Sequence, residues 1–334
     1  MKLILHIGGA KCGSSAIQRY NATHRDRLAS QYGCLVPDTT LGMEGPFTGE
    51  QIFFFEQMRK DKENGVKIVA SRMGQLKRYM QQHGLQTLIV SAENLINLGG
   101  CEKLFASVAS EFDVEIVLYV RRQDQYFVSA WQQWHLKTYA SPQAYVDARL
   151  GIDANWTNML RPWEEQFTSA KFNVRIFQRN RLIEQDVVAD FYATSGLGGL
   201  LEGTQSLVAN KSFSEHLGDM ACRVQDVFDS PHDNAFYEVM ADAIGAQAFK
   251  KSSGSHIYTL QEREDILDAY ADCNEQLRQK YFPDIAADIP LFDPPTERDV
   301  VVKTDEEKSA AEIDLLTRAV FGMLQQLRKR DEAA

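Results

Sequence analysis

The segment His6-Ile7-Gly8-Gly9-Ala10-Lys11-Cys12-Gly13-Ser14-Ser15-Ala16-Ile17-Gln18 joins a compact apolar run, Leu3-Ile4-Leu5, to a pattern typical of a helix. A strand, a glycine-rich turn and a helix form the geometry in which backbone N–H groups surround a phosphate. The N-terminus of the helix adds a partial positive charge. The segment therefore predicts an anion-binding loop directly after the first strand.

This loop departs from an ordinary P-loop in the position of its lysine. The separation of Gly8 and Gly13 is that of a P-loop, but Ser14 stands where lysine is expected after the second glycine. The lysine lies two residues before that glycine, at Lys11. This displacement argues against an ordinary nucleoside triphosphatase and favours a phosphate loop with another use.

The pattern of apolar runs predicts the fold class. Buried parallel strands are expected at residues 3–7, 87–90, 115–120 and 174–177, with helical segments between them. We expect an α/β, P-loop-like three-layer fold with a central parallel sheet flanked by helices. One domain would span residues 1–334, with an α/β core at 1–180 and a mostly helical extension at 181–334. Ligands of such sheets bind beyond the carboxyl ends of the strands.

Helical patterns dominate the second half of the chain, at residues 186–194, 215–228, 235–249, 262–281 and 306–327. In the last of these, Ile313, Leu316, Val320, Met323 and Leu327 recur at helical spacing. Residues 41–64 are different, because glycines and a proline precede an aromatic run and a charged stretch. They predict either an irregular lid that contacts an acceptor or a short amphipathic helix packed on the core.

Composition limits the classes of partner. The 334 residues are 44% hydrophobic and 25% charged, as in globular proteins. The formal net charge of -10 disfavours general binding to nucleic acid or to an anionic membrane, so an anionic ligand needs a local basic pocket. The five cysteines lack metal-site spacing, and neither a signal peptide nor a membrane span is recognised. We therefore expect a cytoplasmic protein with reduced thiols.

Two groups of residues are candidates for binding an anion. In the first, Gly13 lets the backbone approach an oxyanion, Ser14 and Ser15 donate hydrogen bonds, and Lys11 supplies a point charge. The alternative is a glycine-rich turn with a solvated lysine. In the second, Arg121 ends a strand and Ser129 lies two turns into the next helix. Without the first group, an arginine salt bridge and a buried serine would be the better interpretation.

Together these residues resemble the sulfotransferases that use 3′-phosphoadenosine 5′-phosphosulfate (PAPS), in particular their bacterial, carbohydrate-type branch. The first family motif is similar to residues 6–18, and the second, an arginine and a serine eight positions later, is similar to Arg121 and Ser129. Weaker similarities lie at residues 33–37, 89–93, 187–191, 210–214 and 270–274, so the resemblance extends to about residue 282.

The resemblance implies that Lys11, Cys12, Gly13, Ser14 and Ser15 hold the 5′-phosphosulfate, and that Arg121 and Ser129 hold the 3′-phosphate. It implies PAPS as co-substrate, adenosine 3′,5′-bisphosphate (PAP) as product, and no required metal. Cys12 replaces the usual threonine of the motif, which removes a good hydrogen-bond donor at the apex of the loop.

A base must accept the proton of the acceptor hydroxyl. Glu93 is the first candidate because it follows a predicted strand and would face the ligand crevice. It could instead orient Lys11 or pair with an arginine. His135 is the rival base, although a histidine beside a tryptophan is more often structural. His6 is expected to be buried inside the first strand. Lys211 and the basic run at 250–254 could neutralise the 3′-phosphate or a sulfated glycan, but solvated loops are the favoured interpretation.

We therefore expect a sulfotransferase that acts on a saccharide or another small acceptor hydroxyl. One alternative is a phosphotransferase or kinase with a degenerate P-loop, which would depend on magnesium and ATP. The other is a non-catalytic protein that binds a nucleotide or a glycan. The sequence leaves the acceptor and the oligomeric state open.

Overall fold

The computed structural model describes residues 1–45, 51–61, 63–205, 214–249 and 254–333. The chain forms two compact units, each built from three separate segments. The first unit contains Met1–Arg122, Ala154–Asn210 and Asp272–Phe292, and the second contains Gln123–Asp153, Lys211–Ala271 and Asp293–Ala334. The boundary expected near residue 180 therefore falls inside a segment of the first unit.

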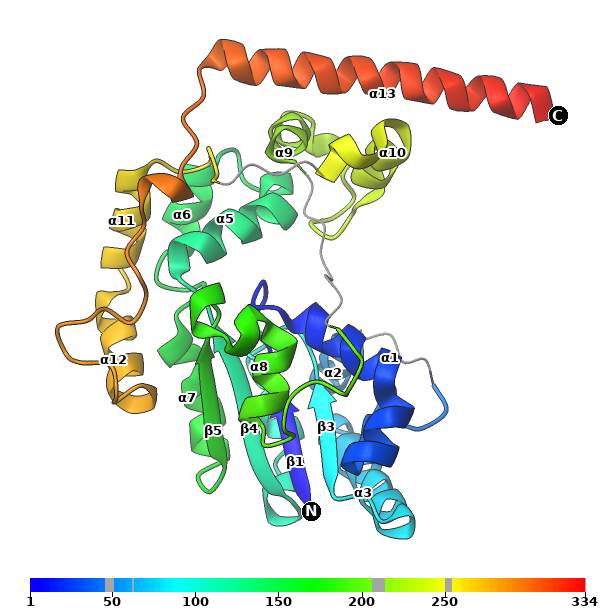
Figure 1. Ribbon diagram of the computed structural model, residues 1–334, viewed down its shortest axis with the longest axis vertical. Coiled ribbons are helices and arrows are strands. Elements are labelled where there is room, and N and C mark those ends of the chain that lie inside the picture. Colours follow the sequence, from blue (N-terminus) through cyan, green and yellow to red (C-terminus); the bar gives the residue numbers. More distant parts are fainter. Residues whose placement is uncertain (46–50, 62, 206–213, 250–253, 334) are drawn as a thin grey trace. The chain divides into compact units, whose positions relative to one another are not determined.

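A parallel five-stranded sheet forms the centre of the first unit (Figure 1). Its strands are β1 (Lys2–His6), β2 (Cys34–Leu35), β3 (Thr87–Ser91), β4 (Asp113–Val120) and β5 (Lys171–Ile176), in the spatial order β2-β3-β1-β4-β5. All five residues of β3 and four of the five in β1 are buried. Such continuous burial fits a parallel sheet that is covered on both faces.

Helices cover both faces of this sheet, as expected for an α/β three-layer fold. Figure 1 shows α8 in front of the sheet and α2 behind it. The helix α1 packs against α8, whereas α2, α3, α4 and α7 form a second connected series. The helices of the first unit are α1 (Ser14–Tyr32), α2 (Gln51–Lys60), α3 (Gly65–His83), α4 (Cys101–Leu104), α7 (Trp156–Gln166), α8 (Val187–Thr194) and α12 (Ala271–Tyr281).

The described part of the second unit consists mainly of helices. They are α5 (Gln123–Gln133), α6 (Pro142–Arg149), α9 (Glu215–Cys222), α10 (Ala235–Ile244), α11 (Leu260–Asp268) and α13 (Asp305–Ala333), with short 3-10 turns that include His135–Lys137. Local sequence explains several of their starts. Ser141 caps α6 ahead of Pro142, and Thr259 with Glu262 forms a capping box at α11.

The predicted parallel sheet and the additional C-terminal helices are confirmed. All four expected strands exist within one to three residues of their predicted bounds, whereas the two-residue strand β2 was not predicted. For residues 41–64, the described part contains the helix α2, which buries Phe55 and Met58, so the amphipathic-helix alternative is correct there. Residues 46–50 and 62 lie outside the described residues. None of the described helices combines the length and apolar character that crossing a bilayer requires.

Candidate active site around the loop after β1

The loop between β1 and α1 (residues 7–13) lies at the carboxyl edge of the sheet. Three of its residues have positive φ: Gly8 at 28°, Lys11 at 62° and Gly13 at 86°. A Cβ at Gly8 would lie 2.6 Å from the Ser14 Oγ, and one at Gly13 would lie 2.8 Å from the Phe177 ring. Glycine is therefore required at both positions for conformational and steric reasons.

Lys11 adopts a backbone conformation that side chains other than glycine rarely take. A left-handed non-glycine residue costs on the order of 1–3 kcal/mol and persists only where its surroundings hold it. One such restraint is visible here, because Nη1 of Arg121 donates a 2.9 Å hydrogen bond to the Lys11 carbonyl. This hydrogen bond brings the arginine that follows β4 next to the backbone of the loop.

Trp156 supports the same corner of the site from the start of α7. Its Nε1 donates a 2.9 Å hydrogen bond to the Arg121 carbonyl, and its ring lies 3.1 Å from where a Cβ of Gly9 would be. The indole is fully buried. Sequence reasoning missed Trp156 because it lies 35 residues beyond Arg121 and carries no phosphate-binding pattern. Its only local signal is an aromatic residue directly after the helix-capping Asn155.

Glu93 lies beside the loop, as expected for a residue that follows β3. The register of the sheet pairs His6 with Ser91, and the Asn94 N–H donates to the Gly8 carbonyl at 2.8 Å. The Ser15 hydroxyl donates a 3.0 Å hydrogen bond to Oε2 of Glu93. A hydroxyl has one proton to donate, so Ser15 can serve either Glu93 or a bound anion, but not both at once.

Ser14 and Cys12 point into the loop itself. The Ser14 hydroxyl donates to the Gly9 carbonyl at 3.3 Å, which uses the proton that the sequence analysis assigned to a phosphate. The Cys12 side chain is fully buried, and its thiol donates to the Ala10 carbonyl at 3.3 Å. Burial raises the pKa of Cys12 to about 12, so the thiol stays protonated and unreactive at neutral pH.

His6 is buried below the loop, as predicted. Its Nδ1 lies 2.7 Å from the Ser91 hydroxyl, and burial lowers the pKa of the imidazole to about 3. A ring that is neutral at physiological pH and enclosed within the sheet is a structural element. The charged side chains of the candidate site are therefore Lys11, Arg121 and Glu93.

Ser129 and His135 belong to the second unit, whereas Lys11, Cys12, Gly13, Ser14, Ser15, Glu93 and Arg121 all belong to the first. Ser129 is half-buried on α5. The His135 ring stacks on Tyr145 at 4.0 Å, and its Nε2 lies 3.9 Å from Asp153. Burial lowers the pKa of His135 to about 4, which leaves the ring neutral. These contacts agree with the structural interpretation of His135.

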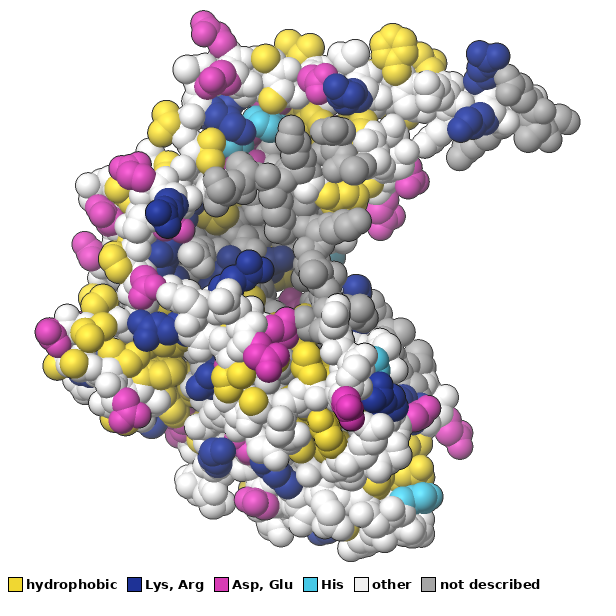
Figure 2. Space-filling view, viewed as in Figure 1, with side chains coloured by type: hydrophobic (Ala, Val, Ile, Leu, Met, Phe, Trp, Pro, Cys, Tyr) yellow, Lys and Arg dark blue, Asp and Glu magenta, His cyan; other side chains and the backbone are white. Residues whose placement is uncertain are grey.

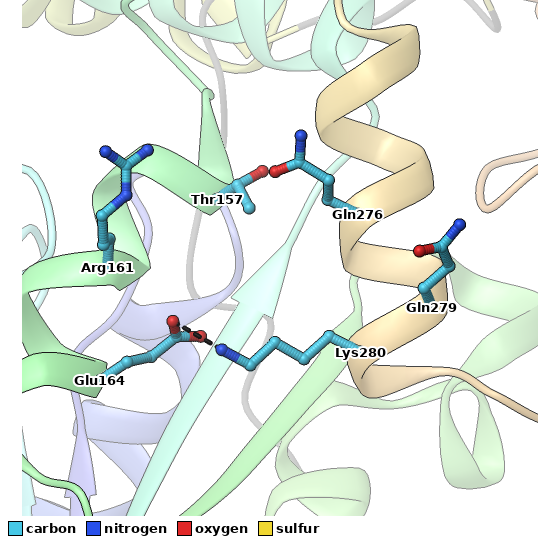
Figure 3. A pocket seen from close by; sticks show the side chains of 6 residues that line it. All are labelled: Thr157, Arg161, Glu164, Gln276, Gln279 and Lys280. Atoms are coloured by element: carbon cyan, nitrogen blue, oxygen red, sulfur yellow. Dashed lines mark ion pairs between the residues drawn. The ribbon is translucent and has the colours of Figure 1, made fainter.

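A second feature of the first unit is a polar groove of about 430 Å³ between α7 and α12 (Figure 3). Its lining residues are Thr157, Arg161, Glu164, Gln276, Gln279 and Lys280. Glu164 and Lys280 form a 2.7 Å ion pair across it. The groove shares no lining residue with the loop after β1, so its polar groups are not part of the candidate active site.

The described residues of the second unit contain one group with metal-ligand geometry, formed by His216, Asp219 and Glu312. Cationic side chains already occupy it. Nζ of Lys303 lies 2.8 Å from Nε2 of His216, and Arg223 forms two hydrogen bonds with Glu312. We call these five residues, together with Glu215 and His256, the charge cluster. Its cations already compensate its carboxylates, so it is best described as a structural ion-pair network.

His256 connects two carboxylates of the charge cluster. Its Nδ1 lies 2.8 Å from Glu215 and its Nε2 lies 2.7 Å from Asp219. Burial alone would lower the pKa of His256, but the two carboxylates raise it to about 9. The imidazole is therefore protonated at neutral pH. Lys211 and residues 250–253, which were also considered as basic groups, lie outside the described residues.

No family model matches the sequence. An uncharacterized protein of Archaeoglobus fulgidus is 28% identical over 199 residues, which cover 58% of this chain and 54% of that protein. The matched region thus spans about half the length of this relative. A chain from the structural characterization of the PezAT toxin-antitoxin system of Streptococcus pneumoniae has 13% identity and a TM-score of 0.24, covering 67% of this chain and 86% of its own length. A similarity of that size carries no argument.

Proposed function

We propose that this protein is a sulfotransferase that moves the sulfuryl group of PAPS to an acceptor hydroxyl, with carbohydrate hydroxyls as the first class to test. The observation that carries the proposal is the left-handed Lys11 in a glycine loop before a helix, with Arg121 bonded to its carbonyl at 2.9 Å. Backbone strain held in place by its surroundings is common at ligand-binding and catalytic positions. A loop of this kind also suits an anion at the start of α1.

In the proposed reaction, the acceptor oxygen attacks sulfur in line with the bridging oxygen of the donor. The new oxygen–sulfur bond forms as the bond from sulfur to the phosphate oxygen breaks, and PAP leaves. Lys11 stabilises the negative charge that develops on the bridging oxygen, together with backbone N–H groups of the loop. Loss of one such preorganised donor commonly lowers the rate by about 10²–10³-fold. Arg121 holds the loop and contributes to binding the 3′-phosphate.

Glu93 accepts the proton of the acceptor hydroxyl in this proposal. In the structure, Oε2 of Glu93 accepts the one hydrogen bond that the Ser15 hydroxyl can donate. When the phosphosulfate takes over that hydrogen bond, Glu93 loses a donor. A carboxylate that loses a donated hydrogen bond accepts a proton more readily. Binding of the donor would thus prepare the base for the next step.

The first experiment measures thermal unfolding with PAP and with ATP, each with and without magnesium. PAP is expected to raise the melting temperature without magnesium, and ATP much less. No shift at millimolar PAP would contradict the proposal. ATP turnover that requires magnesium would favour the phosphotransferase alternative.

The second experiment measures transfer from PAPS to a panel of saccharides and other hydroxyl compounds. Lys11→Ala is expected to lower turnover by about 10²–10³-fold with an unchanged circular dichroism spectrum. The matched control is Lys67→Ala, which removes an exposed lysine of α3 in the same unit. Substantial turnover by Lys11→Ala would remove Lys11 from the mechanism. Binding of PAP without transfer to any acceptor would favour the non-catalytic alternative.

A further inference from the structure

One face of the helix α13, here called the inner face, is buried against other helices of its own unit. It packs on α9 and α10, and Glu312, Leu315 and Ala319 are buried there (Figure 1). The helices approach each other closely at Gly322, where a Cβ would lie 2.1 Å from the Ala243 carbonyl oxygen. The residues of the inner face thus bind α13 to its own unit.

A second apolar row runs along α13. Most of its residues follow a residue of the inner face by one position in the sequence, so the row lies on an adjacent side of the helix. We call Ile313, Leu316, Val320, Met323 and Leu327 the outer seam. Ile313 is 64% exposed, Leu316 and Val320 are each 50% exposed, and Leu327 is 55% exposed. The neighbouring Leu324 is also 54% exposed. Figure 2 shows hydrophobic side chains among charged ones along this helix at the top of the view.

The spacing of the outer seam is that of a coiled coil. Its five residues are separated by steps of three, four, three and four positions. This a/d pattern keeps one narrow apolar stripe facing a partner helix. From Ile313 to Leu327 the stripe is about 21 Å long at 1.5 Å per residue. A helix of similar length and pattern is the surface that fits it.

We infer that the outer seam joins two copies of this chain through an antiparallel pair of α13 helices. Charge along the helix selects this occupant. At the start of the helix, residues 305–308 comprise three acidic residues and one lysine, a net charge of -2. Near the other end, residues 328–332 comprise three basic and two acidic residues, a net charge of +1. In an antiparallel pair, the net negative end of each helix lies toward the net positive end of its partner. A parallel pair would place like charges together at both ends.

The same charges argue against a membrane as the partner. Asp305, Glu306, Glu307 and Asp314 are all exposed and acidic in the first part of α13. An amphipathic helix that lies on an anionic bilayer is typically rich in lysine and arginine on its polar face. A symmetric pair of copies is a common form of assembly, and it needs one self-complementary surface only. The outer seam with its opposite charges at the two ends is such a surface.

The test is sedimentation equilibrium of the full chain over a wide range of protein concentration, at low and at high salt. The wild type is expected to dimerise, more weakly at high salt because the paired ends attract each other. Leu316→Glu combined with Val320→Glu is expected to raise the dissociation constant at least about 100-fold. The matched control is Val239→Glu on α10, whose side chain is 53% exposed and lies outside the seam.

A charge variant tests the orientation of the pair. Arg328→Glu with Lys329→Glu places acid beside acid in an antiparallel dimer and is expected to weaken it about tenfold. In a parallel dimer, the same change leaves like charges paired, and high salt strengthens the wild-type dimer. A monomer at all concentrations, a dimer unaffected by the seam variants, or the parallel salt response would each overturn the inference. So would a monomer that binds anionic phosphatidylserine vesicles through the seam.

Discussion

The loop after β1 and the charge cluster both gather basic and acidic side chains, but they are built differently. In the loop, Arg121, Ser14 and Cys12 donate to backbone carbonyls and the adjoining Ser15 donates to Glu93, and the backbone itself adopts three positive φ values. In the charge cluster, side chains pair with side chains, as Arg223 does with Glu312. Most of the donors of the loop therefore hold its backbone in shape, whereas the cluster balances charge between side chains within the protein.

The largest expected effect is a difference in unfolding free energy between two glycine substitutions. Gly13 and Gly84 both have positive φ, but only Gly13 has side chains close to where a Cβ would be. Gly13→Ala should lower the free energy of unfolding by about 3 kcal/mol, because the new methyl group adds backbone strain and a clash with Phe177. Gly84 has a φ of 68° but nothing within 4 Å of a Cβ, so Gly84→Ala should cost only about 1 kcal/mol. Urea unfolding measures both. Equal losses of unfolding free energy for the two variants would mean that the side chains around Gly13 do not constrain the loop.

The next effect tests the charge cluster through pH. The pKa of His256 is about 9 in the folded protein, above that of an unfolded histidine, so its contribution is fully present below about pH 6.5. It is lost as the pH rises through 9. Wild-type stability should fall by roughly 2 kcal/mol over this interval relative to His256→Gln. Urea unfolding at several pH values checks this, and parallel profiles for the two proteins would contradict it.

A smaller effect tests the bond that holds Lys11. Arg121→Ala should lower the free energy of unfolding by about 1.5 kcal/mol, since it removes a hydrogen bond from a charged donor. Arg161→Ala, which removes an exposed arginine of α7, should cost less than about 0.5 kcal/mol. Calorimetric titration should also show that Arg121→Ala weakens PAP binding more than Glu93→Ala. The reverse order would exchange the roles assigned to these residues.

The smallest effect concerns the unusual residue of the loop. Cys12→Thr should change the affinity for PAP by less than about threefold, because the side chain is buried and a threonine hydroxyl can also donate to the Ala10 carbonyl. Titration calorimetry measures the difference. A gain of tenfold or more would show that the residue at position 12 contacts the ligand after all.

The sequence predicted what short-range patterns control. Buried apolar runs identified four strands, and the glycines with Lys11 located the loop after β1. Glu93 could be placed beside that loop because it follows a strand that neighbours β1. The helix breaks were harder, since residues 262–281 form two helices with Tyr270 between them. The Tyr270 hydroxyl accepts a hydrogen bond from the Gly151 N–H and donates one to the Asp153 carbonyl. These contacts join distant segments, so no local sequence pattern predicts them.

Contacts between distant segments could not be predicted. Trp156 lies against Gly9 and donates a hydrogen bond to the Arg121 carbonyl, although both residues are far from it in the sequence. The charge cluster combines residues of α9 with His256, Lys303 and Glu312, none of which carries a metal or catalytic spacing by itself. The outer seam was visible as a helical repeat. Only the structure showed that four of its five residues are exposed, with Met323 half-buried, and that a different row faces α9 and α10.

The interleaved course of the chain has a consequence for how the protein is made. The polypeptide passes between the two units five times, because three segments of each unit alternate along the sequence. During synthesis, the first unit cannot be completed until Phe292 has left the ribosome, and by then most of the second unit has also been made. Closing such long loops slows folding. No single cut in the chain can release either unit, so a nascent chain must complete both units almost together.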